Sequence, residues 1–147
     1  MPYFDTHDHV RLQYTDWGEG RPIILCHAWA LSSDAWQYQV PDLVAAGRRC
    51  ITYDRRGHGR SDRPGGGYDI DTLADDLAAL VDHVGIEDAD LVGHSLGCSE
   101  IVRFTTRHGF GRVGRVVFLA PIMPNLLAAS RPEFPVTRST AMQELNE

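Results

Sequence analysis

Cysteine, basic charge and long apolar runs are all scarce in this sequence, and each scarcity excludes a class of protein. The three cysteines, Cys26, Cys50 and Cys98, lie in or beside apolar runs without C-x-x-C spacing, which indicates neither a disulfide framework nor a zinc site. The net charge of −6 argues against a nucleic-acid partner. No apolar run approaches the length of a membrane span, and the first eight residues do not form a basic and then apolar leader. We therefore expect a soluble, cytoplasmic protein.

Patterns typical of a bound metal or phosphate are also missing. The His-Asp-His stretch at residues 7–9 lies at an expected hairpin turn with no third ligand, so a solvated turn is the simpler interpretation. The glycine-rich stretches at 57–59 and 65–67 lack the G-x-x-x-x-G-K pattern of a phosphate-binding loop. The sequence predicts neither a metal nor a cofactor.

Strand and helix signals alternate along the chain, which predicts an α/β fold: a three-layer α/β/α sandwich with a mostly parallel sheet. Hydrophobic residues make up 43% of the 147, enough for the core of one domain. The expected strands are 10–14, 22–26, 49–53, 89–92 and 113–119, and the expected helices are 36–46, 69–84 and 98–108. Pro41 demands a break or a second start within the first helix. The pattern fades after residue 124, so we divide the chain into a core, 1–124, and a cap segment or irregular tail, 125–147.

The most informative stretch is Gly93-His94-Ser95-Leu96-Gly97, which reads G-x-S-x-G between an expected strand and an expected helix. Such a sharp bend thrusts the central side chain out at the carboxyl end of the strand, and the two glycines let strand and helix approach. The N-terminus of the helix favours negative charge that develops beside Ser95. Ser95 is therefore a candidate nucleophile. The alternative is a Gly-rich turn in which Ser95 is only a helix N-cap.

Several further motifs stand in the order found in one known family. Three of them are Gly18-Glu19-Gly20-Arg21-Pro22, His27-Ala28-Trp29 and Tyr53-Asp54-Arg55-Arg56-Gly57-His58-Gly59-Arg60-Ser61. Residues 31–39 and 71–77 add a closer match to one branch of that family. Together with G-x-S-x-G they resemble the α/β-hydrolase fold family, and within it the branch of cofactor-free haloperoxidases and aryl esterases. The resemblance covers Asp16 to about Pro124 and is specific as a set.

This resemblance implies a serine hydrolase that acts on a small-molecule ester or other acyl substrate through an acyl-serine intermediate. It implies Ser95 as the nucleophile, and the backbone N–H groups of Trp29 and Leu96 as the oxyanion hole. Some relatives also form peracids from carboxylic acids and peroxide without metal or haem, so a perhydrolase side activity is implied too. Epoxide hydrolases and haloalkane dehalogenases of this fold carry aspartate where Ser95 stands, whereas lactonase, thioesterase and C–C-bond hydrolase activities stay open.

The chain departs from the family pattern at two positions in the expected loops. Ala28 stands where the family commonly has glycine, so Ala28 must adopt an ordinary backbone conformation or cost about 1 kcal/mol or more. His9 follows Asp8 where the family often has a tight Asp-Gly turn, and histidine tolerates positive φ better than bulky residues do.

A serine hydrolase also needs a histidine base and an acid that orients it, and neither follows the nucleophile here. Residues 120–125 hold no carboxylate, and His108 lies about 20 Å away along the expected helix. We expect His94 to point elsewhere, and His27 and His58 to have structural roles in their loops. The resemblance is therefore to the N-terminal half of a hydrolase, truncated before the cap and the C-terminal strands. We expect the 147 residues alone to be inactive.

A second interpretation is a truncated module that has lost its chemistry and acts by binding a partner or itself. The strand expected at 113–119 would be an edge strand with a continuous apolar core. Such an edge favours a homo-oligomer or association with a missing C-terminal half. The encoding DNA discriminates between the two: a reading frame that continues past Glu147 favours a fragment of an enzyme, and a stop codon there favours the module.

Overall fold

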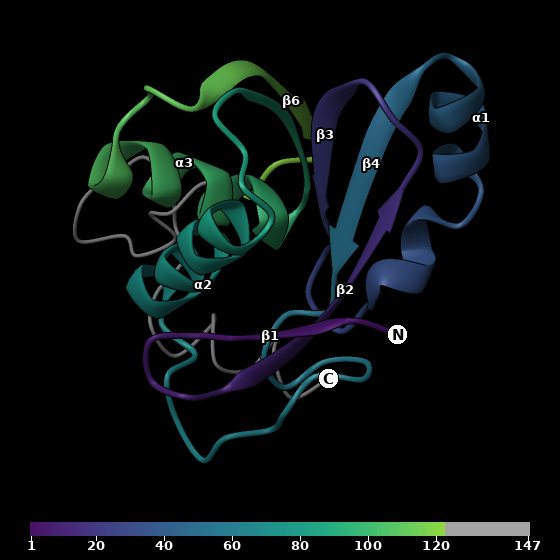
Figure 1. Ribbon diagram of the computed structural model, residues 1–147. Helices are drawn as coiled ribbons and strands as arrows, with labels where there is room; N and C mark the ends of the chain where they lie inside the picture. The colour runs from purple at the N-terminus through teal and green to yellow at the C-terminus, as the bar shows by residue number, and fades with distance from the viewer. Residues whose placement is uncertain (123–147) are drawn as a thin grey trace.

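Within residues 1–122, which are those that the computed structural model describes, the chain forms a six-stranded sheet with helices on both faces (Figure 1). The strands are β1 (Tyr3–Asp5), β2 (Arg11–Trp17), β3 (Arg21–Cys26), β4 (Arg48–Tyr53), β5 (Ala89–His94) and β6 (Val113–Leu119). The helices are the 3₁₀ helix η1 (Ser33–Trp36), α1 (Gln39–Ala45), α2 (Ile70–His83) and α3 (Leu96–His108). Every strand and helix expected from the sequence is present, and β1 is an addition.

The sheet has the order β1-β2-β4-β3-β5-β6. β4, β3, β5 and β6 run parallel to one another, whereas β1 and β2 add to them as an antiparallel hairpin. Ile24 on β3 lies opposite both Ile51 on β4 and Leu91 on β5, and all three side chains are buried. Strands that are buried on both faces are rich in apolar residues, and β3 has the continuous apolar run expected for such a strand. The mostly parallel sheet predicted from the sequence is confirmed.

Helices α2 and α3 cover one face of the sheet, and η1 and α1 lie on the other (Figure 1). The larger core lies under α2 and α3, where Leu77, Leu80, Ile101 and Phe104 pack against the sheet. The smaller core lies under η1 and α1 and includes Trp36. The predicted three-layer α/β/α sandwich is therefore confirmed.

The segment expected as one helix over 36–46 divides into two. η1 ends at Trp36, and α1 begins at Gln39, two residues before Pro41. The first four N–H groups of a helix have no partner within it, so proline costs no hydrogen bond at this position. Pro41 thus marks a second helix start, as the sequence predicted.

The turn between β1 and β2 has the geometry expected at Asp8 and His9. His9 has a φ of 62°, and its N–H donates to Thr6 O at 3.0 Å. The Asp8 carboxylate accepts two N–H groups of Arg56, at 2.9 and 3.0 Å. Asp8 therefore ties the hairpin to the segment after β4.

Strand β6 is at the edge of the sheet within the described part of the chain. Its apolar side chains are half-exposed, from 37% at Val116 to 48% at Val117. The association predicted through this edge stays a prediction. The second predicted region, 125–147, lies outside the described residues. Among residues 1–122 we find no helix with the length and apolar character that a membrane crossing requires.

Candidate active site

Ser95 lies at the turn between β5 and α3, in a backbone conformation that few side chains adopt. Its φ is 53° and its ψ is −113°. The Ser95 N–H donates to Leu119 O at 3.0 Å, and Ser95 O accepts the N–H of Cys98 at 3.0 Å. Ser95 occupies the N-cap position of α3, but its side chain makes no capping hydrogen bond there. The strand–turn–helix geometry expected around Ser95 is present.

Two glycines make this turn sterically possible. A Cβ at Gly93 would lie 2.7 Å from Cys98 N, and a Cβ at Gly97 would lie 2.4 Å from Cys26 O. Both distances are well below van der Waals contact. Both neighbours are backbone atoms of packed elements, which can move only slightly to make room. Glycine at both positions therefore lets α3 begin against the end of β5 and pass beside the end of β3.

The chain after β3 forms the loop to which the family resemblance assigns part of the oxyanion hole. Ala28 is buried and has no positive φ, whereas Ala30 has a φ of 59°. The strain considered for Ala28 is absent because the loop places its left-handed residue two positions later. Within residues 1–122, neither the Trp29 N–H nor the Leu96 N–H donates to another group. The role of these two amides in catalysis stays a prediction.

His27 is buried at the start of this loop, and both of its ring nitrogens are engaged. Nε2 accepts the backbone N–H of Arg55 at 3.1 Å, which leaves the ring proton on Nδ1, where it donates to Ala28 O at 2.7 Å. Burial, together with the nearby Arg55 cation, lowers the pKa of His27 to about 3. A neutral ring with no free nitrogen cannot serve as a base for Ser95, so His27 holds the loop instead.

His58 holds the same loop from the segment after β4. Its Nε2 accepts the N–H of Ala30 at 3.3 Å, and its Nδ1 donates to Arg56 O at 2.9 Å. The Trp29 ring packs edge-on against the His58 ring, with 5.0 Å between the ring centroids. Two histidines therefore fix the backbone on either side of the Trp29 N–H.

No histidine in residues 1–122 hydrogen-bonds to the Ser95 side chain, and all seven histidines of the chain lie in that range. The His94 ring packs against Trp36 on the η1 face of the sheet, with 6.5 Å between ring centroids. His108 is the last residue of α3, about 20 Å along the helix from Ser95, and its Nε2 lies 2.7 Å from Asp75 Oδ1. Within the described residues, no histidine therefore stands as a base beside the Ser95 turn.

Two buried carboxylates brace the site, and sequence reasoning missed both. Asp54, the first residue after β4, accepts the N–H of Ser33 at 2.7 Å and the N–H of Arg60 at 2.8 Å. Glu100 on α3 is completely buried and pairs with Arg55, whose Nη2 lies 2.5 Å from Oε2. The one available signal for Glu100 was an acidic residue within the otherwise apolar stretch at the start of α3.

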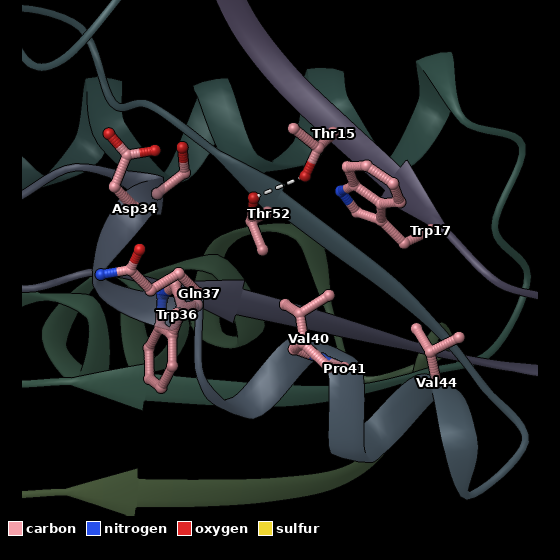
Figure 2. Close-up of a pocket in the computed structure, with 10 residues that line it drawn as sticks. Thr15, Trp17, Asp34, Trp36, Gln37, Val40, Pro41, Val44 and Thr52 are labelled. Carbon is pink, nitrogen blue, oxygen red and sulfur yellow. Dashed lines mark hydrogen bonds between the residues drawn. The ribbon is translucent and has the colours of Figure 1, made fainter.

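A cavity of about 430 Å³ lies on the other side of the sheet from α2 and α3, between β2 and the η1–α1 segment (Figure 2). Its walls are mostly apolar, with Trp17 on the β2 side and Val40 and Val44 on the α1 side. The hydroxyls of Thr15 and Thr52 hydrogen-bond to each other at 2.7 Å within it. None of the residues predicted for the catalytic site lines this cavity.

A family model for the alpha/beta hydrolase fold matches residues 21–143, which is most of the chain. The chain belongs to the α/β-hydrolase fold family. This chain is 46% identical, over 134 residues, to a non-heme haloperoxidase of Rhodococcus erythropolis, and the match covers 90% of this chain and 49% of the relative. It is 40% identical, over 126 residues, to a bifunctional esterase/perhydrolase of Acinetobacter calcoaceticus, and this match covers 84% of this chain and 46% of the relative.

Solved structures of hydrolases share this fold. An esterase from Exiguobacterium antarcticum superposes with a TM-score of 0.91 at 25% identity, over 98% of this chain and 54% of its own. A bromoperoxidase from Bacillus anthracis superposes with a TM-score of 0.86 at 37% identity, over 97% of this chain and 53% of its own. The chain spans about half the length of the relatives it matches, in agreement with the predicted resemblance to one half of a hydrolase.

We expect Gly97→Ala to destabilise the hydrolase fold, because the new Cβ would lie 2.4 Å from Cys26 O and α3 would have to move. Overpacking costs about 1–3 kcal/mol, and so short a contact with backbone belongs at the upper end. That cost exceeds the gain of about 1 kcal/mol that alanine brings to a helix. Gly111→Ala is the matched control, because a Cβ there meets nothing within 4 Å. Equal free energies of unfolding for the two variants in chemical denaturation would contradict this account of the turn.

The buried ring of His27 predicts that the stability of this chain depends on pH. Its pKa of about 3 in the folded state lies below the ordinary value of 6.5, so the unfolded state takes up the proton first as pH falls. The stabilisation from neutral His27 is complete above about pH 6.5 and is lost towards pH 3, by about 1.4 kcal/mol per pH unit. His27→Gln cannot titrate, so its free energy of unfolding should fall less steeply over this range. Parallel curves for the two proteins would show that His27 is not a buried neutral ring.

Proposed function

We propose that this chain carries the nucleophile and the oxyanion hole of a serine hydrolase that acts on small carboxylic esters. The observation that carries the proposal is Ser95 at a φ of 53° between β5 and α3, with its hydroxyl unused for helix capping. A serine with only a structural role at a helix start would cap the helix and would need no strained backbone. Similarity to proteins named esterase, haloperoxidase and esterase/perhydrolase supports this class of reaction.

In the proposed reaction, the Ser95 oxygen attacks the carbonyl carbon of the ester. The carbonyl oxygen gains the negative charge and accepts hydrogen bonds from the N–H groups of Trp29 and Leu96. Loss of one such donor costs on the order of 10²–10³ in rate. Collapse of this intermediate breaks the bond to the alkoxy oxygen, and the alcohol leaves with the proton that the base took from the Ser95 hydroxyl, while the acyl group stays on Ser95. Water then attacks the acyl carbon and gives a proton to the same base, which returns it to Ser95 as the acid is released. Hydrogen peroxide in place of water would release a peracid, which is the proposed perhydrolase side activity.

We propose that the base for Ser95, and the acid that orients this base, lie outside these 147 residues. His27 and His58 use their ring nitrogens to hold the loop after β3, and His108 pairs with Asp75 at the far end of α3. The relatives that support the proposal are about twice as long as this chain. The chain alone should therefore turn over activated esters poorly, with only the residual rate that an oxyanion hole provides.

A chimera tests this function: the chain replaces the aligned half of the Rhodococcus erythropolis relative, to which it is 46% identical. We expect the chimera to hydrolyse p-nitrophenyl acetate. Ser95→Ala should lower kcat by at least about 10³-fold, because the acyl-enzyme cannot form without the nucleophile. Release of p-nitrophenol measures kcat and KM.

Ser99→Ala is the matched control, because Ser99 lies one turn further along the same helix and its hydroxyl donates to Ile122 O. Its kcat should stay close to that of the unsubstituted chimera. Turnover that survives Ser95→Ala would refute the proposal. Equal loss of activity in folded Ser95→Ala and Ser99→Ala chimeras would refute it as well, because the loss would then not depend on removing the proposed nucleophile.

A further inference from the structure

We propose that the buried ion pair between Arg55 and Glu100 positions the oxyanion loop relative to Ser95, which makes Arg55 a positioning residue for the reaction. This inference rests on the proposed function. Arg55 comes two residues after the end of β4, whereas Glu100 is on α3, five residues after Ser95. The pair therefore joins the loop side of the site to the helix that presents the nucleophile.

The Glu100 end of this link is held on both carboxylate oxygens. The exposed fraction is 0% for both the Arg55 and the Glu100 side chains. Arg55 Nη2 and Nε donate to Oε2 at 2.5 and 3.0 Å, and the Tyr53 hydroxyl donates to Oε1. The start of α3 is thus fixed against the end of β4 by hydrogen bonds that water cannot reach.

The Arg55 end of the link holds the first residue of the oxyanion loop. Arg55 Nη2 donates to His27 O at 2.9 Å, and the Arg55 backbone N–H donates to His27 Nε2 at 3.1 Å. One residue therefore fixes His27 at its carbonyl and at its ring, two positions before Trp29. Any displacement of Arg55 would move the backbone that carries the Trp29 N–H, while Ser95 stays with α3.

The chemistry of arginine suits this double task. Burial acts to lower the pKa of Arg55, but the Glu100 carboxylate and Tyr53 together outweigh it, so the pKa is raised and the cation persists. The planar guanidinium presents its N–H groups at fixed angles, so it serves the carboxylate and the His27 carbonyl at once. A lysine ammonium is a point charge on a flexible stem and lacks this geometry.

Stability alone gives no reason for the pair. Replacement of a buried ion pair by well-packed apolar residues is often neutral or stabilising. The neighbouring pair of Arg56 and Asp76 offers a direct comparison, because both of its side chains are also buried and their closest atoms, Nη2 and Oδ1, lie 2.6 Å apart. That pair ties the same segment to α2 instead of α3, and so it lies outside the link between Ser95 and the oxyanion loop.

The test compares two double variants of the full 147-residue chain. Arg55→Met/Glu100→Leu removes the link without leaving an unpaired buried charge, and Arg56→Met/Asp76→Leu is the matched control. The first readout is deuterium exchange of a peptide that contains residues 27–31. The second is the rate at which p-nitrophenyl acetate acetylates Ser95, measured by intact mass with Ser95→Ala as the blank.

In Arg55→Met/Glu100→Leu we expect residues 27–31 to exchange about tenfold faster or more. Acetylation of Ser95 should be about tenfold slower or more, since one displaced oxyanion donor is worth on the order of 10²–10³ in rate. The chain should stay folded, because no buried charge is left without a partner. Arg55→Lys keeps the positive charge but lacks the planar set of N–H groups that binds Glu100 and His27 O together, so it should show the same two effects. The control pair should show neither.

Unchanged exchange and acetylation in a folded Arg55→Met/Glu100→Leu chain would overturn the inference, and so would equal effects in the control pair. If exchange rises but the unsubstituted chain shows no Ser95-dependent acetylation, the positioning role stands and the proposed function fails. If the double variant does not fold, Arg55→Lys decides, because unchanged exchange in that variant would overturn the inference.

Discussion

The close approach of α3 to the ends of β3 and β5 is the constraint on which the site depends. With no Cβ at Gly93 or Gly97, the helix begins directly after the strand, and Ser95 alone absorbs the change of direction at a φ of 53°. A strained residue persists only where its surroundings over-determine it, as the packed backbone atoms of Cys26 and Cys98 do here. The same constraint leaves the Leu96 N–H at the first position of a helix, where no backbone carbonyl of that helix can reach it.

Buried polar groups, more than apolar packing, hold the loops around that turn. Loops carry backbone donors and acceptors that must be satisfied once they are buried. Asp54 accepts two backbone N–H groups, and His27 and His58 each accept one. The chain contains no lysine, so every long basic partner is an arginine, whose fork can bind two acceptors at once. The result is a set of backbone amides fixed in advance, which is the condition for electrostatic stabilisation of an oxyanion.

Features encoded by neighbouring residues could be predicted from the sequence. The apolar run of β3, the periodicity of α2 and the two glycines around Ser95 are local patterns, and the structure has the expected strand, helix and turn. The partners of Glu100 could not be predicted, because Arg55 is 45 residues away and no pattern in the sequence around α3 indicates it. The left-handed residue of the loop after β3 is Ala30, whose N–H donates to His58, and the sequence around it does not mark that position.

Covalent attachment of a fluorophosphonate tests most directly whether Ser95, at this turn, is the nucleophile that we propose. The chain, joined to the second half of a haloperoxidase relative, is treated with the reagent, digested and mapped by peptide mass spectrometry. We expect one adduct per chain, on the peptide that carries Ser95, and we expect an ester substrate to compete with the reagent. An adduct on a different serine, or ester turnover that continues after Ser95 is fully modified, would contradict it.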